Sequence, residues 1–241
     1  MKFKALLLAA LLPLTAQADV VRVAVGLALP PYVIADENRG AELDIVREAL
    51  ALRGHKTEAV YVPFRKFVPM VVDGEVDAAL TLSEDSGADS LFYSDSHITY
   101  QNMAIGLSER QLKVDSIADL GRYWVMGFHD AKKYLGEEYA AMAEKSPHYS
   151  ETSRQKSQIS MLFSERVDLV VSDKNIFNWY RRQLNKVEYS RPVTYYPLFP
   201  PNHYKVGFNK EALRDDFNLG LKQLKDSGRY NQILEYYFRE I

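Results

Sequence analysis

The sequence predicts an α/β protein made of two similar halves, and two observations support this. Apolar strand patterns alternate with amphipathic helix patterns along the chain, which is typical of parallel βαβ units. Two stretches, VDAALTLSEDSG at 76–87 and VDLVVSDKN at 167–175, each carry a Val-Asp pair into an apolar run that ends in polar residues. Ligands bind beyond the carboxyl ends of strands in open α/β sheets. If the halves face each other, both polar ends are expected to line one cleft.

The first half begins with an apolar run at 20–27, which predicts a strand leading to a turn at two consecutive prolines. A helix is expected over about 41–53, because Leu43, Val46 and Leu50 recur at helical spacing and a glycine follows. The remaining expected elements are a strand at 60–62, a short helix around 67–71 and the Val-Asp strand at 76–80.

The second half repeats this alternation. A strand at 123–127 precedes Asp130, whose side chain is suited to cap the helix that follows. Another helix ends near Leu162, before the second Val-Asp strand at 167–171. Two amphipathic helices, one around Leu221 and one near the end of the chain, are expected to close the fold.

The first residues predict export. Lys2 and Lys4 precede an apolar run from Ala5 to Leu14, and small residues follow at 16–18 in the order Ala-Gln-Ala. This is the pattern of a secretory signal peptide over residues 1–18, since about ten apolar residues are too few to span a bilayer. We therefore expect a periplasmic protein.

The composition excludes several further classes of protein. The chain contains no cysteine, which excludes disulfides and a lipid anchor on a cysteine. Without the two lysines of the signal peptide, the formal net charge becomes −4 instead of −2, and no basic stripe is present. We therefore expect no nucleic-acid partner. The apolar fraction of 47% is ordinary for a soluble globular protein.

Five stretches, in this order, resemble the bacterial extracellular solute-binding proteins of the polar amino-acid type (family 3). They are LPPYVIADENRGAELDIVREAL, VPFRKFVPMVVDGEVDAAL, LFYSD, ERVDLVVSD and FNLGLKQLKDSGRYNQILEYYF. The resemblance implies a two-lobed type II periplasmic-binding fold, in which each lobe is a mixed sheet flanked by helices and two crossing hinge strands join the lobes. Lobe 1 is expected to comprise 19–105 and 196–241, and lobe 2 to comprise 106–195.

The resemblance also implies ligand contacts from both lobes. Phe64 occupies the place of an aromatic residue that packs on the ligand, and the hydroxyls of Thr81 and Ser83 are expected to hydrogen-bond it. Asp173 matches the acid that accepts the ligand's ammonium, and a buried ammonium needs such a partner. Tyr32, in the LPPYV segment, is a further candidate.

The family's carboxylate-binding arginine is missing from its expected place. The loop that should supply it reads SEDSGADS and has no basic residue. The Gly-Thr pair that offers backbone N–H groups to the same carboxylate at a helix start is also absent, and His129 and Asp130 stand there. Recognition of an α-amino acid in the usual way is therefore not expected.

Two interpretations of this departure remain open. Arg65 or Lys66, next to Phe64, takes over the solute's carboxylate, since an arginine binds a carboxylate at two points. Alternatively the solute is a cationic amine without a carboxylate. The acids that favour a cation are Glu84, Asp85, Asp130 and Asp173. Each residue, taken alone, also fits a solvated loop or a helix cap.

The expected function is that of a receptor. It captures a small polar solute, an amino acid or an amine, and delivers it to an inner-membrane ABC permease; a membrane sensor protein is the alternative partner. An enzyme on the same fold is a third class, but neither a nucleophile elbow nor a His-Glu-x-x-His pattern is present, and the five histidines are scattered. We expect a monomer with no enzymatic activity, no cofactor and no metal.

Overall fold

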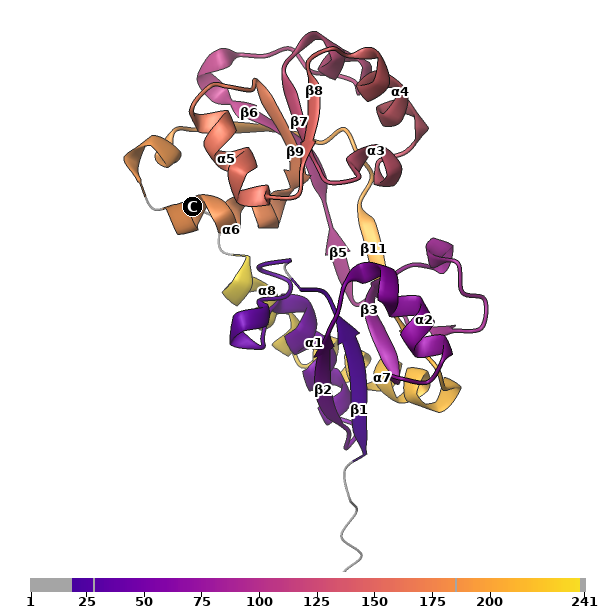
Figure 1. The fold of residues 1–241 in the computed structure, drawn as a ribbon. Coiled ribbons are helices and arrows are strands. Elements are labelled where there is room, and N and C mark those ends of the chain that lie inside the picture. Colours follow the sequence, from indigo (N-terminus) through magenta and orange to yellow (C-terminus); the bar gives the residue numbers. More distant parts are fainter. Residues whose placement is uncertain (1–18, 28, 185, 239–241) are drawn as a thin grey trace, which may run out of the picture.

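A computed structural model describes residues 19–27, 29–184 and 186–238, which form two α/β lobes (Figure 1). The predicted signal peptide, residues 1–18, lies outside the described residues. Within the described part of the chain, no helix combines the length and apolarity that crossing a bilayer requires.

Lobe 1 contains a mixed sheet in the order β2-β1-β3-β11-β4, with β5 also paired to β11. The first three strands pair in parallel, and β11 runs antiparallel to β3, β4 and β5. The strands are β1 (Val20–Val25), β2 (Lys56–Tyr61), β3 (Ala78–Leu82), β4 (Phe92–Tyr93), β5 (Ile98–Tyr100) and β11 (Asn202–Phe208).

Lobe 2 contains a second mixed sheet in the order β10-β6-β9-β7-β8. Strands β7, β8 and β9 pair in parallel, whereas β6 runs antiparallel to β9 and β10. The strands are β6 (Asn102–Leu107), β7 (Val125–Phe128), β8 (Tyr149–Thr152), β9 (Leu169–Asp173) and β10 (Val193–Tyr196).

Helices flank both sheets. In lobe 1 they are α1 (Ala41–Ala51), α2 (Phe67–Val72), α7 (Glu211–Asp226) and α8 (Arg229–Tyr237), with 3₁₀ turns η1 (Ala35–Glu37), η2 (Phe64–Lys66) and η3 (Glu84–Ser86). In lobe 2 they are α3 (Ala131–Tyr134), α4 (Glu137–Lys145), α5 (Gln155–Phe163) and α6 (Lys174–Leu184), with η4 (Ser108–Arg110), η5 (Ala118–Arg122) and η6 (Val187–Ser190). The predicted two-lobed α/β architecture is confirmed.

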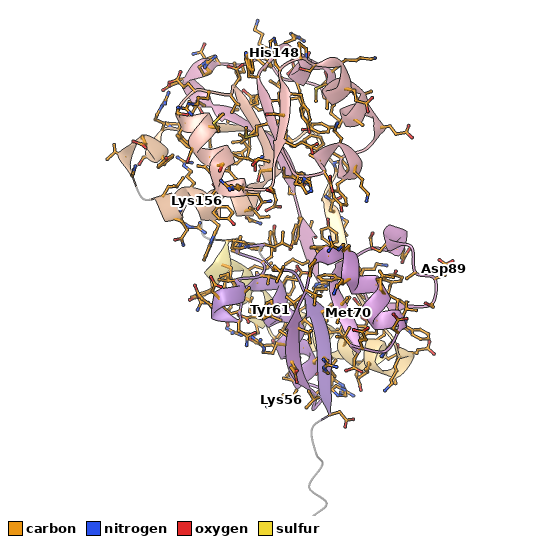
Figure 2. The ribbon with its side chains drawn as sticks, in the orientation of Figure 1. Lys56, Tyr61, Met70, Asp89, His148 and Lys156 are labelled. Carbon is orange, nitrogen blue, oxygen red and sulfur yellow. The ribbon has the colours of Figure 1, made fainter. Side chains whose placement is uncertain are left out.

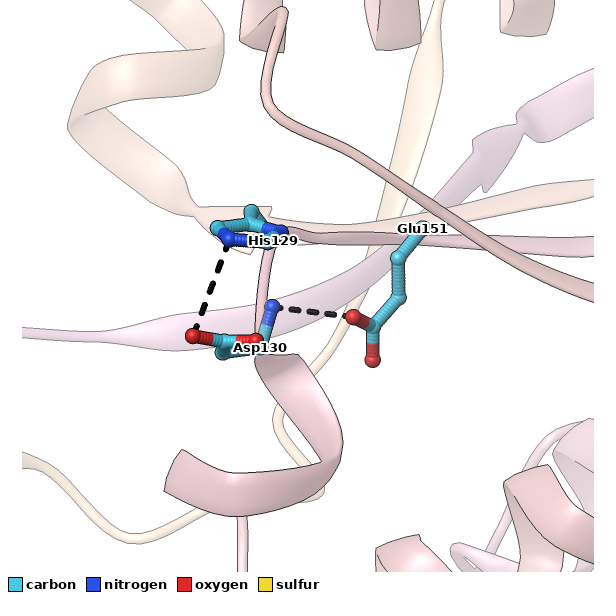
Figure 3. Close-up of side chains that lie close together, drawn as sticks. All are labelled: His129, Asp130 and Glu151. Carbon is cyan, nitrogen blue, oxygen red and sulfur yellow. Dashed lines mark hydrogen bonds and ion pairs between the residues drawn. The ribbon is translucent and has the colours of Figure 1, made fainter.

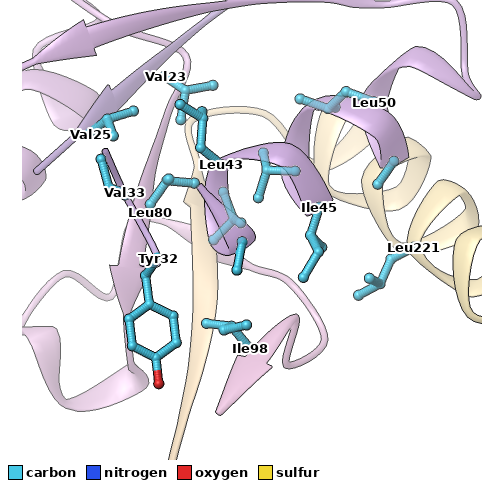
Figure 4. Close-up of a cluster of buried hydrophobic side chains, with 14 of the residues drawn as sticks. Val23, Val25, Tyr32, Val33, Leu43, Ile45, Leu50, Leu80, Ile98 and Leu221 are labelled. Carbon is cyan, nitrogen blue, oxygen red and sulfur yellow. The ribbon is translucent and has the colours of Figure 1, made fainter. Parts of the chain in front are cut away.

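The core of lobe 1 forms where α1 and α7 pack against each other and against the sheet. Leu43 and Leu50, predicted on one helical face, are fully buried with Leu221 of α7 (Figure 4). The two helices approach so closely that a Cβ on Gly220 would lie 2.0 Å from the carbonyl oxygen of Ala49. This position therefore requires glycine. In lobe 2, separate apolar clusters line the two faces of the sheet.

The two Val-Asp pairs perform the same structural task in the two lobes. Oδ2 of Asp77 accepts the backbone N–H of Arg22 at 2.8 Å, and Oδ2 of Asp168 accepts that of Trp124 at 2.9 Å. Each acid thus fixes the beginning of the neighbouring parallel strand. The strands β3 and β9 begin after these acids and extend two residues further than the sequence predicted, because backbone pairing continues past Thr81 to Leu82 in β3 and through Ser172 and Asp173 in β9.

The carboxyl ends of the parallel strands of the two lobes face each other. In Figure 2, Lys56 at the start of β2 lies at the far end of lobe 1, and Tyr61 at its end lies nearer to lobe 2. His148, directly before β8, lies at the opposite extremity of lobe 2. Both sets of strand ends therefore point toward the region between the lobes.

The chain passes between the sheets twice. It leaves β5 and enters β6 through Gln101, and it returns from β10 to β11 through 197–201 (Figure 1). The predicted lobe boundaries at 105/106 and 195/196 fall inside β6 and β10, which both belong to the second sheet.

Candidate solute-binding site

The nine candidate residues occupy two kinds of environment. Tyr32, Thr81 and Asp173 are buried, and the Tyr32 hydroxyl of lobe 1 contacts Asp173 of lobe 2. The others are at least partly exposed at the strand ends and turns: Phe64, Arg65, Ser83, Glu84, His129 and Asp130.

Asp173 ends strand β9 and is only 3% exposed. Its Oδ1 accepts the backbone N–H groups of Asn175 (2.8 Å) and Ile176 (3.0 Å) at the start of α6, and its Oδ2 accepts that of Gln101 (2.8 Å). The Tyr32 hydroxyl lies 3.1 Å from both oxygens. Burial raises the pKa of Asp173 to about 6, although these hydrogen bonds oppose the shift.

Tyr32 belongs to lobe 1 and connects Asp173 to a second buried acid. Its ring stacks on Tyr100 with 3.6 Å between centroids and 15° between planes. The Tyr100 hydroxyl donates to Oε2 of Glu42 at 2.8 Å. Burial raises the pKa of both phenols well above their ordinary value, so both remain donors at neutral pH.

Glu42 is fully buried and accepts three hydrogen bonds. Besides Tyr100, Thr81 Oγ1 donates to Oε1 at 2.9 Å, and His97 Nε2 lies 2.9 Å from the same oxygen. The Thr81 hydroxyl, expected to contact the solute, is thus used inside lobe 1. Thr81 adopts φ 54°, a left-handed conformation that a β-branched residue rarely takes and that the surrounding structure must hold in place.

Glu42 was not among the residues predicted from the sequence, although its position carries a signal. Glu42 is three and four residues before Ile45 and Val46, which places an acid on the apolar face of the predicted helix. A charge on a buried face needs partners. Those partners, His97 and Tyr100, come from a distant segment and could not be assigned from spacing.

The exposed candidates of lobe 2, His129 and Asp130, lie beside Glu151, which the sequence did not indicate (Figure 3). Oε2 of Glu151 accepts the backbone N–H of Asp130 at 2.9 Å, and Oε1 accepts that of Lys132 at 3.1 Å and the Tyr149 hydroxyl at 2.8 Å. Burial favours a higher pKa for Glu151, but these hydrogen bonds outweigh it and lower the pKa. A carboxylate of the chain itself therefore takes N–H groups at the start of α3.

His129 and Asp130 lie beside this carboxylate. Their side chains are 70% and 50% exposed, and Nε2 of His129 is 3.7 Å from Oδ2 of Asp130. One ligand atom from each of His129, Asp130 and Glu151 lies within 4.8 Å of the others, a spacing compatible with a cation. Both oxygens of Glu151 already accept hydrogen bonds, which lowers its capacity to coordinate one.

The exposed residues of lobe 1 include an aromatic surface and a basic group. Phe64 is 44% exposed and stacks on Phe67 with ring centroids 4.5 Å apart. Arg65, the next residue in η2, is exposed and makes no ion pair or side-chain hydrogen bond with the described part of the chain. A solute that contacts the Phe64 ring would therefore lie beside the residue, Arg65, that carries this guanidinium.

Polar side chains of the loop after β3 already form hydrogen bonds with other residues of the chain. Ser83 and Ser86 cap η3 reciprocally, with Ser83 N donating to Ser86 Oγ at 2.9 Å. Lys205 of β11 donates to Oε1 of Glu84 at 2.6 Å, and this bond lowers the pKa of Glu84. Lys205 thus supplies a basic group at the loop where the family's arginine is missing, and sequence order gave no indication of it.

A cavity of about 540 Å³ lies elsewhere, on lobe 1 between the start of α1 and α8. It is lined by Arg39, Asp44, Arg229 and residues of α8. It contains none of the nine candidates, so we do not assign the solute to it.

Two α/β lobes joined by two crossings, with facing strand ends, define a type II periplasmic-binding fold. The chain belongs to the bacterial extracellular solute-binding proteins, family 3, whose model matches residues 21–240. No curated protein matches the chain.

Solved structures share this fold at low identity. An ancestral arginine-binding protein bound to glutamine is 20% identical, with a TM-score of 0.67 over 93% of this chain and 100% of that chain. A histidine kinase sensor domain with similarity to periplasmic binding proteins is 16% identical, with a TM-score of 0.69 over 93% and 98%. The substrate binding protein of an amino acid ABC transporter is 18% identical, with a TM-score of 0.63 over 92% and 100%.

Proposed function

We propose that this protein captures a small polar solute between its lobes in the periplasm and delivers it to an ABC-type permease of the inner membrane. Membership of the solute-binding family over residues 21–240 carries the proposal. The solved relative described as the substrate binding protein of an amino acid ABC transporter supports the delivery step. The protein acts as a monomer that binds and releases its solute without converting it.

A cationic amine is the solute class that the local charges favour. The N–H groups of Asp130 and Lys132, which the resemblance assigns to a solute carboxylate, already bind Glu151. A second carboxylate about 4 Å from Glu151 would be repelled by roughly 4 kcal/mol near a protein surface. An ammonium would instead be attracted by Glu151 and by exposed Asp130.

An α-amino acid remains the alternative, with its carboxylate bound by lobe 1. Arg65 supports this alternative because it is exposed, has no ion pair among the described residues and adjoins Phe64. Lys205 is a weaker candidate, since it is already paired with Glu84.

A sensing role is the second candidate function. The similarity to a histidine kinase sensor domain supports it, because that domain has the same fold. In this role the loaded receptor would contact a membrane signalling protein instead of a permease.

Identification of the solute tests the proposal directly. Native mass spectrometry of protein purified without denaturation should reveal a bound small molecule. A thermal-shift panel should then show stabilisation by amines such as 1,4-diaminobutane and weak or no stabilisation by common α-amino acids. Ligand at about 100 times its dissociation constant stabilises a protein by roughly 2.7 kcal/mol, which is a readable rise in Tm.

Arg65→Ala separates the two solute classes. It should leave amine binding intact and abolish the shift with any amino acid that binds. Lys56→Ala is the matched control, since Lys56 is exposed at the end of lobe 1 far from lobe 2 (Figure 2). A large shift with an ordinary amino acid that persists in Arg65→Ala would contradict the proposed recognition.

Uptake and sensing differ in their cellular readout. Cells carrying the gene should accumulate the identified solute in radiolabelled form, and cells lacking the gene should not. A solute-dependent change in transcription without any change in accumulation would favour sensing.

A further inference from the structure

Among the residues that the structure describes, Tyr32 is the lobe 1 residue whose side chain donates to Asp173. The other donors to Asp173 are backbone N–H groups, two at the start of α6 and one at Gln101 in the crossing. The Tyr32 hydroxyl, 3.1 Å from both carboxylate oxygens, comes from the loop between β1 and α1. A change in the angle between the lobes would therefore alter this contact, together with the hydrogen bond from Arg182 on α6 to the Tyr237 carbonyl oxygen on α8.

Tyr32 is held firmly within lobe 1. It is fully buried and stacks on Tyr100, whose hydroxyl binds Glu42. Glu42 is in turn fixed by Thr81 on β3, so the ring position is tied to both α1 and the sheet. The hydroxyl consequently moves with lobe 1 as a unit.

Asp173 is held equally firmly on the other side of the contact. It pairs with Asn102 in the register of β6 and β9 and binds the start of α6. Gln101, which also donates to Asp173, reaches the second crossing through Nε2, 2.9 Å from the carbonyl oxygen of Phe199. Asp173 therefore lies beside both crossings, on the lobe 2 side of the contact with Tyr32.

The acceptor capacity of Asp173 is already filled. A carboxylate offers about four lone-pair sites, and the three backbone donors and Tyr32 occupy them. Asn175 Nδ2 donates to the Tyr32 hydroxyl at 2.9 Å and so orients the hydroxyl proton toward Asp173. The backbone donors are fixed by secondary structure, which leaves Tyr32 as the donor that can be exchanged.

We propose that Tyr32 is a positioning residue that locks the two lobes, through Asp173, in the arrangement of Figure 1, and that a cationic solute unlocks them by replacing the Tyr32 hydroxyl at Asp173. This inference rests on the proposed solute-binding function for its second part. Binding then changes the lobe angle because the solute and the Tyr32 hydroxyl compete for one carboxylate, so that each arrangement of the lobes forms only one of the two contacts.

The lock is tested without any solute, which separates its failure from failure of the proposed function. The chain contains no cysteine, so cysteines introduced at exposed Asp89 in lobe 1 and Lys133 in lobe 2 accept spin labels at those positions alone. Pulsed electron resonance then measures the distribution of distances between the lobes. Tyr32→Phe, which keeps the stacked ring, should increase the population of other lobe angles roughly tenfold or more, the effect of losing one hydrogen bond to a charged group.

Tyr204→Phe is the matched control. Tyr204 packs edge-on against Tyr100 with centroids 4.9 Å apart, and its hydroxyl makes no hydrogen bond within the described part of the chain. This variant should reproduce the wild-type distribution. If Tyr32→Phe also reproduces it, the lock does not exist.

A double-mutant comparison shows whether Tyr32 acts through Asp173. Asp173→Asn alone should change the distance distribution in the same direction, and adding Tyr32→Phe to it should change the distribution no further. Additive changes would overturn the coupling. In the wild type, 1,4-diaminobutane at a concentration that saturates its calorimetric binding should produce the Tyr32→Phe distribution; binding that leaves the distribution unchanged would overturn the competition.

Discussion

The contribution of Asp173 to the free energy of unfolding should fall as the pH rises from about 4 to about 6. Burial raises the pKa of this carboxyl from 3.8 to about 6 in the folded protein. The folded state therefore retains a proton that the unfolded state releases in this interval. By linkage, the contribution is fully present below the unfolded pKa of about 4 and is lost as the pH rises through the folded pKa of about 6.

The size of the effect follows from the shift. A difference of about 2 pKa units corresponds to about 3 kcal/mol, at about 1.4 kcal/mol for each unit. The full conversion applies because Asp173 is 3% exposed and water screens it little. Asp173→Asn removes the titrating group, so the wild-type minus variant difference in unfolding free energy should change by about this amount between pH 4 and pH 6.

Urea unfolding at several pH values measures this difference, and the baseline cost of the substitution cancels when only the slopes are compared. Glu84→Gln is a control of opposite sign. The hydrogen bond from Lys205 lowers the pKa of Glu84, so its contribution is fully present above the unfolded pKa of 4.5 and is lost as the pH falls through the lower folded pKa. A wild-type slope that Asp173→Asn leaves unchanged would refute the reasoning and show that Asp173 titrates as an exposed acid does.

Two further predictions concern solute specificity and the core. Glu151→Ala frees the N–H groups at the start of α3. Calorimetry should therefore show that α-amino acids which the wild type binds weakly bind the variant roughly tenfold tighter or more. Unchanged affinities would show that Glu151 does not determine specificity. Gly220→Ala forces a Cβ to within 2.0 Å of the Ala49 carbonyl oxygen and should lower the Tm by several degrees, whereas Gly121→Ala, whose Cβ would be 3.7 Å from its nearest neighbour, should not.

The sequence alone determined the two-half α/β architecture. Hydrophobic periodicity depends on a few neighbouring residues, so Leu43 and Leu50 could be assigned to a buried helical face and the Val-Asp strands to the two sheets. The order of the motifs then indicated the solute-binding family, which the family match confirms. The ends of β3 and β9 were placed too early, because apolar runs stop before backbone pairing does.

The sequence also indicated which polar residues are candidates for the site, but it did not indicate their hydrogen-bond partners. Acids and hydroxyls after a strand are visible in a single stretch of chain, as at Thr81 and Asp173. Whether such a group faces a solute or another side chain depends on segments that only the fold brings together. The prediction that these two residues contact the solute therefore stays a prediction, beside the internal hydrogen bonds that the structure gives them.

Only the tertiary structure decided which polar groups pair. Tyr32 and Asp173 are 141 positions apart in the chain, and Lys205 and Glu84 are 121 apart. Such pairs form because the topology sets the start of α6 against the loop after β1, and β11 beside the loop after β3. A side chain's hydrogen-bond partner is a property of the folded surface around it, whereas helical and strand periodicity is a property of the local chain. For that reason the fold followed from the sequence, and the pairing of the charged and polar side chains between the strand ends did not.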